Sequence, residues 1–196
     1  MDYKSKIILI AGPTASGKSK IAINLAKKIN GEIINADSMQ VYKQLKILTA
    51  RPSEKDQKNI RHHLFGVIDV RKRFSTGQWL KKCIKIINLI RKKNKTPIIV
   101  GGTGLYFKAL VDGLVSIPKF KPSEKNKILK LHNKLGQKQF YKKLVKLDPV
   151  CKKFINSNDV NRSIRAYEVR KLTKKSLYKW FKDCLLYTSP SPRDDL

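Results

Sequence analysis

The stretch Gly12-Pro13-Thr14-Ala15-Ser16-Gly17-Lys18-Ser19 decides the fold of this 196-residue chain. It fits the phosphate-binding pattern G-x-x-x-x-G-K-[ST]. The apolar, β-branched run from Lys6 to Ile10 precedes it, and apolar residues at helical spacing follow it from Lys18 onward. Strand, loop and helix in this order form the context that the pattern requires. We therefore predict a site for a di- or polyphosphate.

The chemistry of such a loop comes from its backbone. Consecutive N–H groups and the N-terminus of the following helix make a nest for an anion. Lys18 adds a positive charge, and the Ser19 hydroxyl is the usual ligand for a Mg²⁺ that bridges the phosphates. The pattern leaves open whether the diphosphate belongs to a nucleotide. The candidate diphosphate-binding residues are Gly12, Pro13, Thr14, Ala15, Ser16, Gly17, Lys18 and Ser19.

Further strands and helices alternate along the first part of the chain. The segments Glu32 to Ala36 and Pro97 to Val100 are predicted strands, and a predicted helix lies between them. Strands that alternate with helices indicate a parallel sheet with helices on both faces, so we expect a P-loop NTPase-like α/β fold. One face of the intervening helix carries Trp79, Cys83, Ile86, Ile87 and Ile90.

The pattern changes after Pro118, where helical periodicity and Lys-rich faces begin. We expect an α/β core over residues 1–118 and a basic helical segment over residues 119–183. That segment holds 20 Lys and Arg against five Asp and Glu, half of the net charge of +30. Such a surface suits a nucleic-acid backbone, although a merely Lys-rich composition would look the same.

Residues 184–196 differ from the rest of the sequence. They are polar and Pro-rich, and they resemble a translated sequencing adapter, so we expect a non-native, disordered tail. The three cysteines are far apart and are expected to be reduced thiols. The sequence has no apolar stretch long enough for a membrane span or a signal peptide, so we expect a cytoplasmic protein that does not contact membranes. We also expect a monomer.

The acidic residues argue against an ordinary ATPase. The strand Ile98-Ile99-Val100 runs into Gly101-Gly102-Thr103-Gly104, where an ATPase would carry an acidic residue for Mg²⁺ or water. The other acidic candidate is Asp37, at the end of the second predicted strand and therefore near the phosphate-binding loop. Its carboxylate could bind Mg²⁺, cap the next helix or accept a proton.

Six motifs in one order resemble the tRNA dimethylallyltransferases. They are GPTASGKS, DSMQVY (37–42), TARPS (49–53), HHL (62–64), VGGTGLY (100–106) and NRSIRA (161–166). The resemblance runs from about Ile7 to Trp180. Members of this family are typically about half as long again, so we expect the last third of the protein to be absent and turnover to be poor.

The resemblance implies a substrate and a role for each matched position. The loop would bind dimethylallyl diphosphate with Mg²⁺, and Asp37 would be the general base that accepts a proton from an adenine amine in tRNA. Thr103 would lie on the other wall of the channel where the substrates meet. The implied tRNA contacts are Asp37, Ser38, Met39, Gln40, Thr103, Lys125, Asn161, Arg162, Ser163, Ile164 and Arg165. Asn161 stands where the family has Gln, and Lys125 where Arg is common.

Three other functions fit parts of the pattern. An isopentenyltransferase acting on free adenine nucleotides would share the loop and the aspartate, but the basic segment favours tRNA. A P-loop nucleotide kinase would need the second acidic strand that the sequence lacks. A truncated chain could also bind nucleic acid without catalysis.

Overall fold

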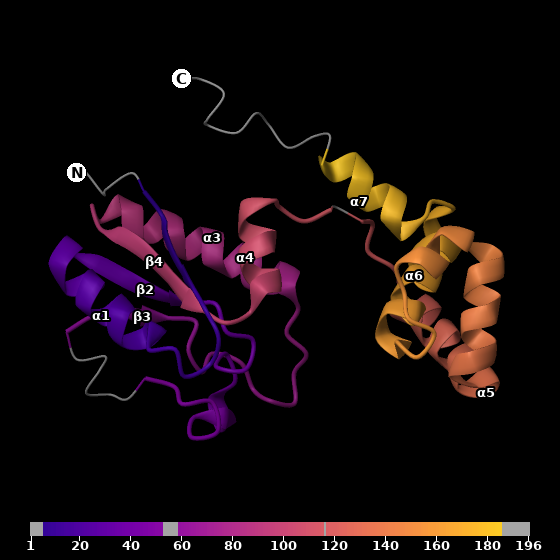
Figure 1. Ribbon diagram of the computed structural model, residues 1–196, viewed down its shortest axis with the longest axis horizontal. Helices are drawn as coiled ribbons and strands as arrows, with labels where there is room; N and C mark the ends of the chain where they lie inside the picture. Colours follow the sequence, from indigo (N-terminus) through magenta and orange to yellow (C-terminus); the bar gives the residue numbers. More distant parts are fainter. Residues whose placement is uncertain (1–5, 53–58, 116, 186–196) are drawn as a thin grey trace. The chain divides into compact units, whose positions relative to one another are not determined.

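The computed structural model describes residues 6–52, 59–115 and 117–185, with side chains to residue 182 (Figure 1). The chain divides into a first unit, residues 1–113, and a second unit, residues 114–196. Ser53 and most of the tail that we expect to be foreign lie outside the described residues.

The first unit is built on a four-stranded parallel sheet. Its strands are β1 (Ile8–Ala11), β2 (Gly31–Asn35), β3 (His62–His63) and β4 (Thr96–Gly101), in the order β1-β4-β2-β3. β4 therefore lies between the first two strands of the chain, and it pairs with both in parallel. This arrangement confirms the predicted parallel sheet, with strand ends displaced by one or two residues. The two-residue β3 has no apolar run and was not predicted.

Helices cover both faces of the sheet, as predicted (Figure 1). On one face, Ile33 and Ile98 pack with α1 (Lys18–Ile29). On the other face, Ile34 and Ile99 pack with α3 (Thr76–Lys92) and α4 (Gly104–Val111). Alternate residues of β2 and β4 thus point to opposite helical layers, which is why every residue of both strands is buried.

The start of α3 is fixed by a capping box. The Ser75 hydroxyl accepts a hydrogen bond from the Gln78 N–H at 3.3 Å, and the Gln78 side chain accepts one from the Ser75 N–H at 2.9 Å. These two bonds satisfy backbone donors that the first turn of a helix leaves without partners. The cap therefore sets the position of Trp79, which lies in the first turn and is fully buried.

A charged cluster is buried at the amino end of β2. Glu32 is 2% exposed, and its two carboxylate oxygens bind His63 Nε2 at 2.7 Å and Lys95 Nζ at 3.1 Å. Burial raises the pKa of Glu32, but the hydrogen bonds from His63 and Lys95 outweigh burial and leave it lowered. The carboxylate is therefore charged and paired in the folded protein.

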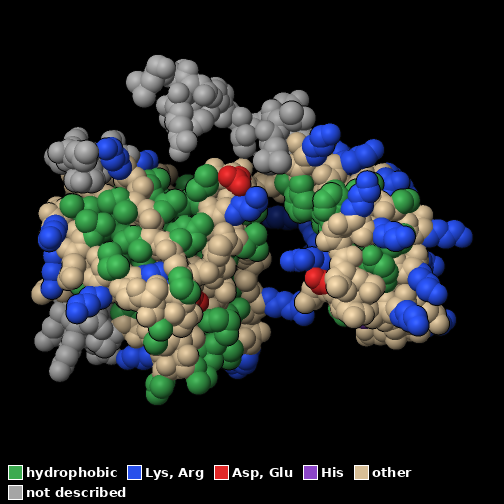
Figure 2. Space-filling view, in the orientation of Figure 1, with side chains coloured by type: hydrophobic (Ala, Val, Ile, Leu, Met, Phe, Trp, Pro, Cys, Tyr) green, Lys and Arg blue, Asp and Glu red, His purple; other side chains and the backbone are tan. Residues whose placement is uncertain are grey.

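The second unit is helical and has its own core. It contains α5 (Pro122–Leu147), the short 3₁₀ helix η2 (Pro149–Lys153), α6 (Val160–Thr173) and α7 (Leu177–Leu185). α5 is broken at Gly136, whose φ of 71° is left-handed. Phe140, Leu144 and Val169 are fully buried between α5 and α6. On the face seen in Figure 2, Lys and Arg side chains gather over this unit.

Among the residues that the structure describes, no helix has the length and apolar character needed to cross a bilayer.

Candidate active site

The phosphate-binding loop has the geometry of an anion nest. It joins the end of β1 to the start of α1, and Gly17 is the N-cap of that helix. Ala15 has a φ of 64° and Gly17 a φ of 76°, so left-handed residues alternate with Ser16, whose φ is not positive. Backbone N–H groups converge in such an alternation, and the positive end of the helix dipole adds to their field.

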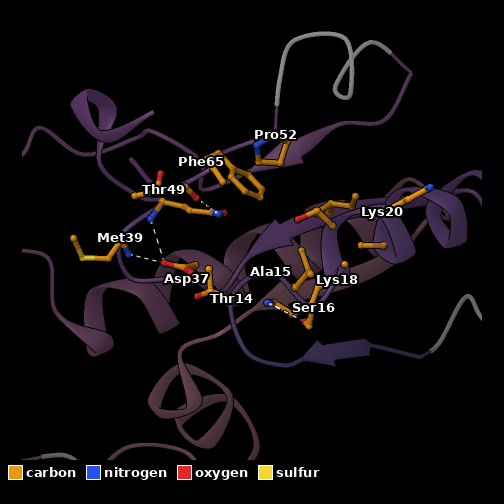
Figure 3. Close-up of a pocket in the computed structure, with 18 of the residues that line it drawn as sticks. Thr14, Ala15, Ser16, Lys18, Lys20, Asp37, Met39, Thr49, Pro52 and Phe65 are labelled. Atoms are coloured by element: carbon orange, nitrogen blue, oxygen red, sulfur yellow. Dashed lines mark hydrogen bonds between the residues drawn. The ribbon is translucent and has the colours of Figure 1, made fainter. Parts of the chain in front are cut away.

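Lys18 reaches back over this loop. Its ammonium group donates a hydrogen bond to the Pro13 carbonyl and lies 3.5 Å from the Ser16 hydroxyl (Figure 3). Gly12 makes room for this fold, because a Cβ there would lie 3.1 Å from Ser16 Oγ and 3.4 Å from Lys18 Cδ. The cation is therefore held directly above the nest, where it can neutralise a bound diphosphate.

A cavity of about 610 Å³ opens beside the loop. This volume lies within the range of roughly 300–1,000 Å³ that is usual for small-molecule sites. Charged, polar and apolar side chains all contribute to its wall (Figure 3). The predicted residues that line it are Thr14, Ala15, Ser16, Gly17, Lys18, Ser19, Asp37, Met39 and Gln40, and the apolar residues include Leu48, Pro52 and Phe65.

The two carboxylate oxygens of Asp37 have different surroundings. Oδ1 accepts hydrogen bonds from the N–H groups of Met39 at 2.8 Å and Gln40 at 3.3 Å, so it caps the turn that follows β2. Oδ2 takes no hydrogen bond from any residue that the structure describes, and it lies near Gly102. One oxygen thus positions the carboxylate while the other is available to a ligand or a proton.

Asn35 holds Asp37 in place, and sequence reasoning missed it. This side chain is fully buried, and its Oδ1 accepts the Asp37 N–H at 2.9 Å. Its Nδ2 donates to the Asp37 carbonyl at 3.0 Å and to the Leu64 carbonyl at 3.1 Å. An Asn directly before a predicted strand end was visible in the sequence, but its partner 29 residues away was not.

Trp79 supports the same strand end from α3. Its indole N–H donates to the Asn35 carbonyl at 2.8 Å, and its ring stacks on Tyr106 with centroids 4.3 Å apart. Burial raises the pKa of Tyr106 to about 12, with the nearby Tyr42 and Asp37 adding to it, so the phenol stays neutral. Apolar spacing had indicated only that Trp79 packs in the core.

Thr103 ties the end of β4 to the turn after β2. Its Oγ1 accepts the Ser38 N–H at 2.9 Å, and its own N–H donates to the Ala36 carbonyl at 3.1 Å. The close approach depends on Gly101, because a Cβ there would lie 2.2 Å from the Ala36 carbonyl group. Thr103 and Asp37 are therefore brought together, although Thr103 does not line the cavity.

The remaining predicted positions lie in the second unit. Asn161, Arg162 and Lys125 are exposed, and Arg165 is half-buried with its guanidinium 5.6 Å from the centre of the Phe120 ring. Ser163 is fully buried, and its Oγ accepts a hydrogen bond from Gln137 at 3.2 Å. Ile164 packs against the core of the unit. Ser163 and Ile164 therefore hold α6 in place, and only the others present side chains to solvent.

The residues present fit a magnesium ion that is held mainly by its substrate. Among the described residues, no group of three or more His, Cys, Asp or Glu could form a complete metal site. Mg²⁺ usually keeps several waters and binds one or two protein oxygens together with substrate phosphates. Ser19 Oγ and the Asp37 carboxylate line the same cavity and can supply such oxygens.

Fold and site together define a P-loop α/β protein whose loop faces a partly apolar cavity, with Asp37 beside it. The strand next to β1 ends in Gly101-Gly102 and has no acidic residue there, unlike an ordinary P-loop ATPase. Comparison with protein families makes the assignment specific.

The chain belongs to the IPP transferase family, whose model matches residues 40–194. The matched range includes most of the tail, so its foreign origin stays a prediction.

Several relatives have an assigned activity. The chain is 61% identical over 180 residues to the tRNA dimethylallyltransferase of Pelagibacter ubique (strain HTCC1062), covering 92% of this chain and 58% of the relative. It is 44% identical over 177 residues to the tRNA dimethylallyltransferase of Rickettsia bellii (strain OSU 85-389), covering 90% and 56%. The chain thus spans a little over half the length of these relatives.

Two solved structures have the same fold. A eukaryotic dimethylallyltransferase acting on tRNA aligns with a TM-score of 0.77 at 32% identity, covering 90% of this chain and 44% of that one. The full-length tRNA isopentenylpyrophosphate transferase of Bacillus halodurans aligns with a TM-score of 0.56 at 36% identity, covering 88% and 57%. Both matches confirm the α/β fold with a parallel sheet.

Proposed function

We propose that this chain carries the catalytic part of a tRNA dimethylallyltransferase. The reaction moves a dimethylallyl group from dimethylallyl diphosphate to the N6 amine of an adenosine next to the anticodon, and it releases diphosphate. One observation carries the proposal: a single cavity joins the anion nest, the Asp37 carboxylate and an apolar wall. An enzyme for this reaction needs a site for the diphosphate, a general base and an apolar surface for the prenyl chain.

The apolar wall suits the prenyl group. Pro52 and Phe65 lie across the cavity from Ala15 and Ser16 of the loop (Figure 3), and Leu48 also lines it. Burial of a five-carbon chain there contributes about 0.8 kcal/mol per methylene-sized group. The allylic carbon would then lie between the nest and Asp37.

The chemistry follows from this placement. The amine nitrogen forms a bond to the allylic carbon while the bond from that carbon to the diphosphate oxygen breaks. Backbone N–H groups of the loop and Lys18 stabilise the charge that the departing diphosphate gains. Asp37 Oδ2 accepts the proton that the amine loses, and a hydrogen bond to it makes the amine a better nucleophile. Mg²⁺, when bound through Ser19, would neutralise part of the diphosphate charge.

The acceptor is proposed to be tRNA because the second unit is strongly basic. Its exposed cations suit a nucleic-acid backbone, with Lys125 and Arg162 as proposed contacts. Asn161 is proposed as a polar contact, and the half-buried Arg165, which pairs with Glu168 at 3.3 Å, as a further one. The adenine must leave its stack to reach the cavity, and Met39 and Gln40, which line the cavity, would contact the base there. Ser38 does not line the cavity but is proposed to contact the base from the same turn. We further propose that the protein works as a monomer in the cytoplasm.

Calorimetry tests the donor. We expect the chain to bind dimethylallyl diphosphate with Mg²⁺ more tightly than ATP, and Lys18→Ala to weaken that binding on the order of tenfold or more. Lys28→Ala, an exposed lysine in the last turn of α1, is the matched control and should bind normally. Stoichiometric ATP binding with hydrolysis, and no response to the allylic diphosphate, would favour a nucleotide kinase and refute the proposal.

An acceptor assay separates tRNA from free nucleotide. Prenyl transfer to unmodified tRNA and to AMP should be measured side by side with the same donor. Transfer to AMP alone would identify an adenine-nucleotide isopentenyltransferase and would remove the tRNA part of the proposal.

A further inference from the structure

A second hollow of the first unit carries only positive charge. It has a volume of about 380 Å³ and lies between the loop 68–74 and the first half of α3. Ile68 and Phe74 form apolar parts of its wall, and Gln78 adds a neutral polar side chain. We call it the α3 groove. Its cations are Lys72, Arg73, Lys81, Lys82 and Lys85.

The charge of the α3 groove is not neutralised within the protein. All five cations are exposed, and none forms an ion pair with a carboxylate of the described residues. Asp69, in the loop of the groove, is engaged mainly by other side chains. Its carboxylate accepts two hydrogen bonds of 2.9 Å from the Arg71 guanidinium and one of 3.1 Å from Gln44, and its charge interaction with Lys72 is weaker than these. α3 itself contains no acidic residue.

Such a concentration of charge has a cost in the free protein. Lys81 and Lys85 are four residues apart on the same side of α3, and like charges at this spacing destabilise a helix by a few tenths of a kcal/mol. A bound polyanion would relieve the repulsion and release counterions. The groove is therefore suited to a ligand with several phosphates along a line.

The α3 groove is tied to the turn that carries Asp37. Ile68 donates its N–H to the Val41 carbonyl at 3.0 Å and accepts the Lys43 N–H at 2.8 Å. The other wall is α3, which contacts the end of β2 through the bond from Trp79 to the Asn35 carbonyl. The cavity with the phosphate-binding loop is on the face of α1, so the residues around Asp37 separate it from the groove.

We propose that the α3 groove binds backbone phosphates of the RNA strand that delivers the acceptor adenosine. The inference rests on the proposed function, because it assumes that the acceptor lies in RNA. Because the loop of the groove is hydrogen-bonded to the turn that carries Asp37, a strand whose adenine lies beside Asp37 can carry neighbouring phosphates to Lys81, Lys82 and Lys85. Contacts to phosphate fix position and register and do not read sequence. The groove thus adds a positioning surface on the first unit that is separate from the basic second unit.

A charge-neutralising variant tests the groove. Lys81→Gln, Lys82→Gln and Lys85→Gln are combined, and binding of unmodified tRNA is followed by fluorescence anisotropy over a range of salt concentrations. Three lost phosphate contacts should weaken binding on the order of tenfold or more and reduce the slope of log K against log salt by about 2. The matched control combines Lys27→Gln, Lys28→Gln and Lys92→Gln, exposed lysines in the last turns of α1 and α3.

Four outcomes decide the inference. Selective weakening by the groove variant, with unchanged binding of dimethylallyl diphosphate, supports it. Equal weakening by both variants shows a diffuse charge effect and overturns it, as does unchanged tRNA binding. If the groove variant instead loses only binding to anionic phosphatidylserine vesicles, the partner is a membrane and the inference is wrong. Failure of the chain to bind dimethylallyl diphosphate would count against the proposed function, a result that is independent of these comparisons.

Discussion

Replacing Asn35 by Ala should loosen the turn that holds Asp37. The change removes three hydrogen bonds and leaves the Leu64 carbonyl buried without this partner. A buried carbonyl that loses its donor costs about 1–3 kcal/mol, and each of the two partly buried bonds to Asp37 contributes about 0.5–1.5 kcal/mol. We therefore expect a loss of about 2–6 kcal/mol in the free energy of unfolding.

Urea unfolding measures this loss. In a Trp180→Phe background, the fluorescence of Trp79 reports on the first unit alone. At about 2 kcal/mol per M of urea, the midpoint should fall by about 1–3 M. Asn88→Ala, an exposed position of α3, is the matched control and should change stability by no more than about 0.5 kcal/mol. Equal midpoints for the two variants would refute the assignment of Asn35 as the anchor of this turn.

The effect of Asn35→Ala on turnover can be measured separately from its effect on stability. Asn35 makes no contact with the phosphate-binding loop, so at temperatures where the variant is folded it should bind inorganic diphosphate within about twofold of the unchanged protein. Turnover can be compared in a chain completed with the C-terminal part of the Pelagibacter relative. There, kcat should fall while the KM for dimethylallyl diphosphate is unchanged. A change in KM alone would show that Asn35 acts on substrate binding instead.

Three further predictions address the site and the fold. In the completed chain, Asp37→Asn should lower the rate of the chemical step by about 10²–10⁴ and leave binding of both substrates nearly unchanged, whereas lost Mg²⁺ affinity in calorimetry would identify a metal ligand. Replacing Arg162 and Arg165 by Gln should weaken tRNA binding and its salt dependence but leave diphosphate binding intact, and a salt-insensitive affinity would show that α6 is merely solvated. Glu32 has a folded pKa below its ordinary value of 4.5, so its stabilising contribution is complete above about pH 4.5 and is lost as the pH falls through the lowered value. Thermal melts of Glu32→Gln should therefore show a weaker acid destabilisation, and an unchanged acid limb would contradict this reading of the pair with His63.

Much of the first unit could be predicted because its signals are local. The phosphate-binding loop and the apolar runs of β1, β2 and β4 are each contained in a few consecutive residues. β3 could not be predicted in this way, because two histidines carry no strand pattern and their pairing with Ile33 and Ile34 is purely tertiary. Periodicity likewise placed Trp79 in the core but could not reveal the hydrogen bond to Asn35.

The sequence predicted the phosphate-binding loop and Asp37, but not the residues that hold them in place. Motif and strand end indicated the loop and Asp37, which share one cavity in the structure. The sequence left three roles open for the Asp37 carboxylate: binding Mg²⁺, capping and accepting a proton. In the structure one oxygen caps the turn after β2, and the other has no hydrogen-bond partner among the described residues. By contrast, Ser163 was predicted to contact tRNA but is buried. Helical spacing alone could not show that Gln137, 26 residues away, donates a hydrogen bond to its hydroxyl.

The strand order also has a consequence for how the chain folds as it is synthesised. β1 is completed within the first 11 residues, yet its neighbour in the sheet is β4, which ends at Gly101. β2 also pairs with β4, which follows it by about 60 residues in the chain. Non-local pairing of this kind is slow, because the loop between the strands must close before any contact compensates for the lost entropy. The phosphate-binding loop thus precedes the other motifs along the chain, yet the strand that feeds it has its sheet partner only after β4 is made.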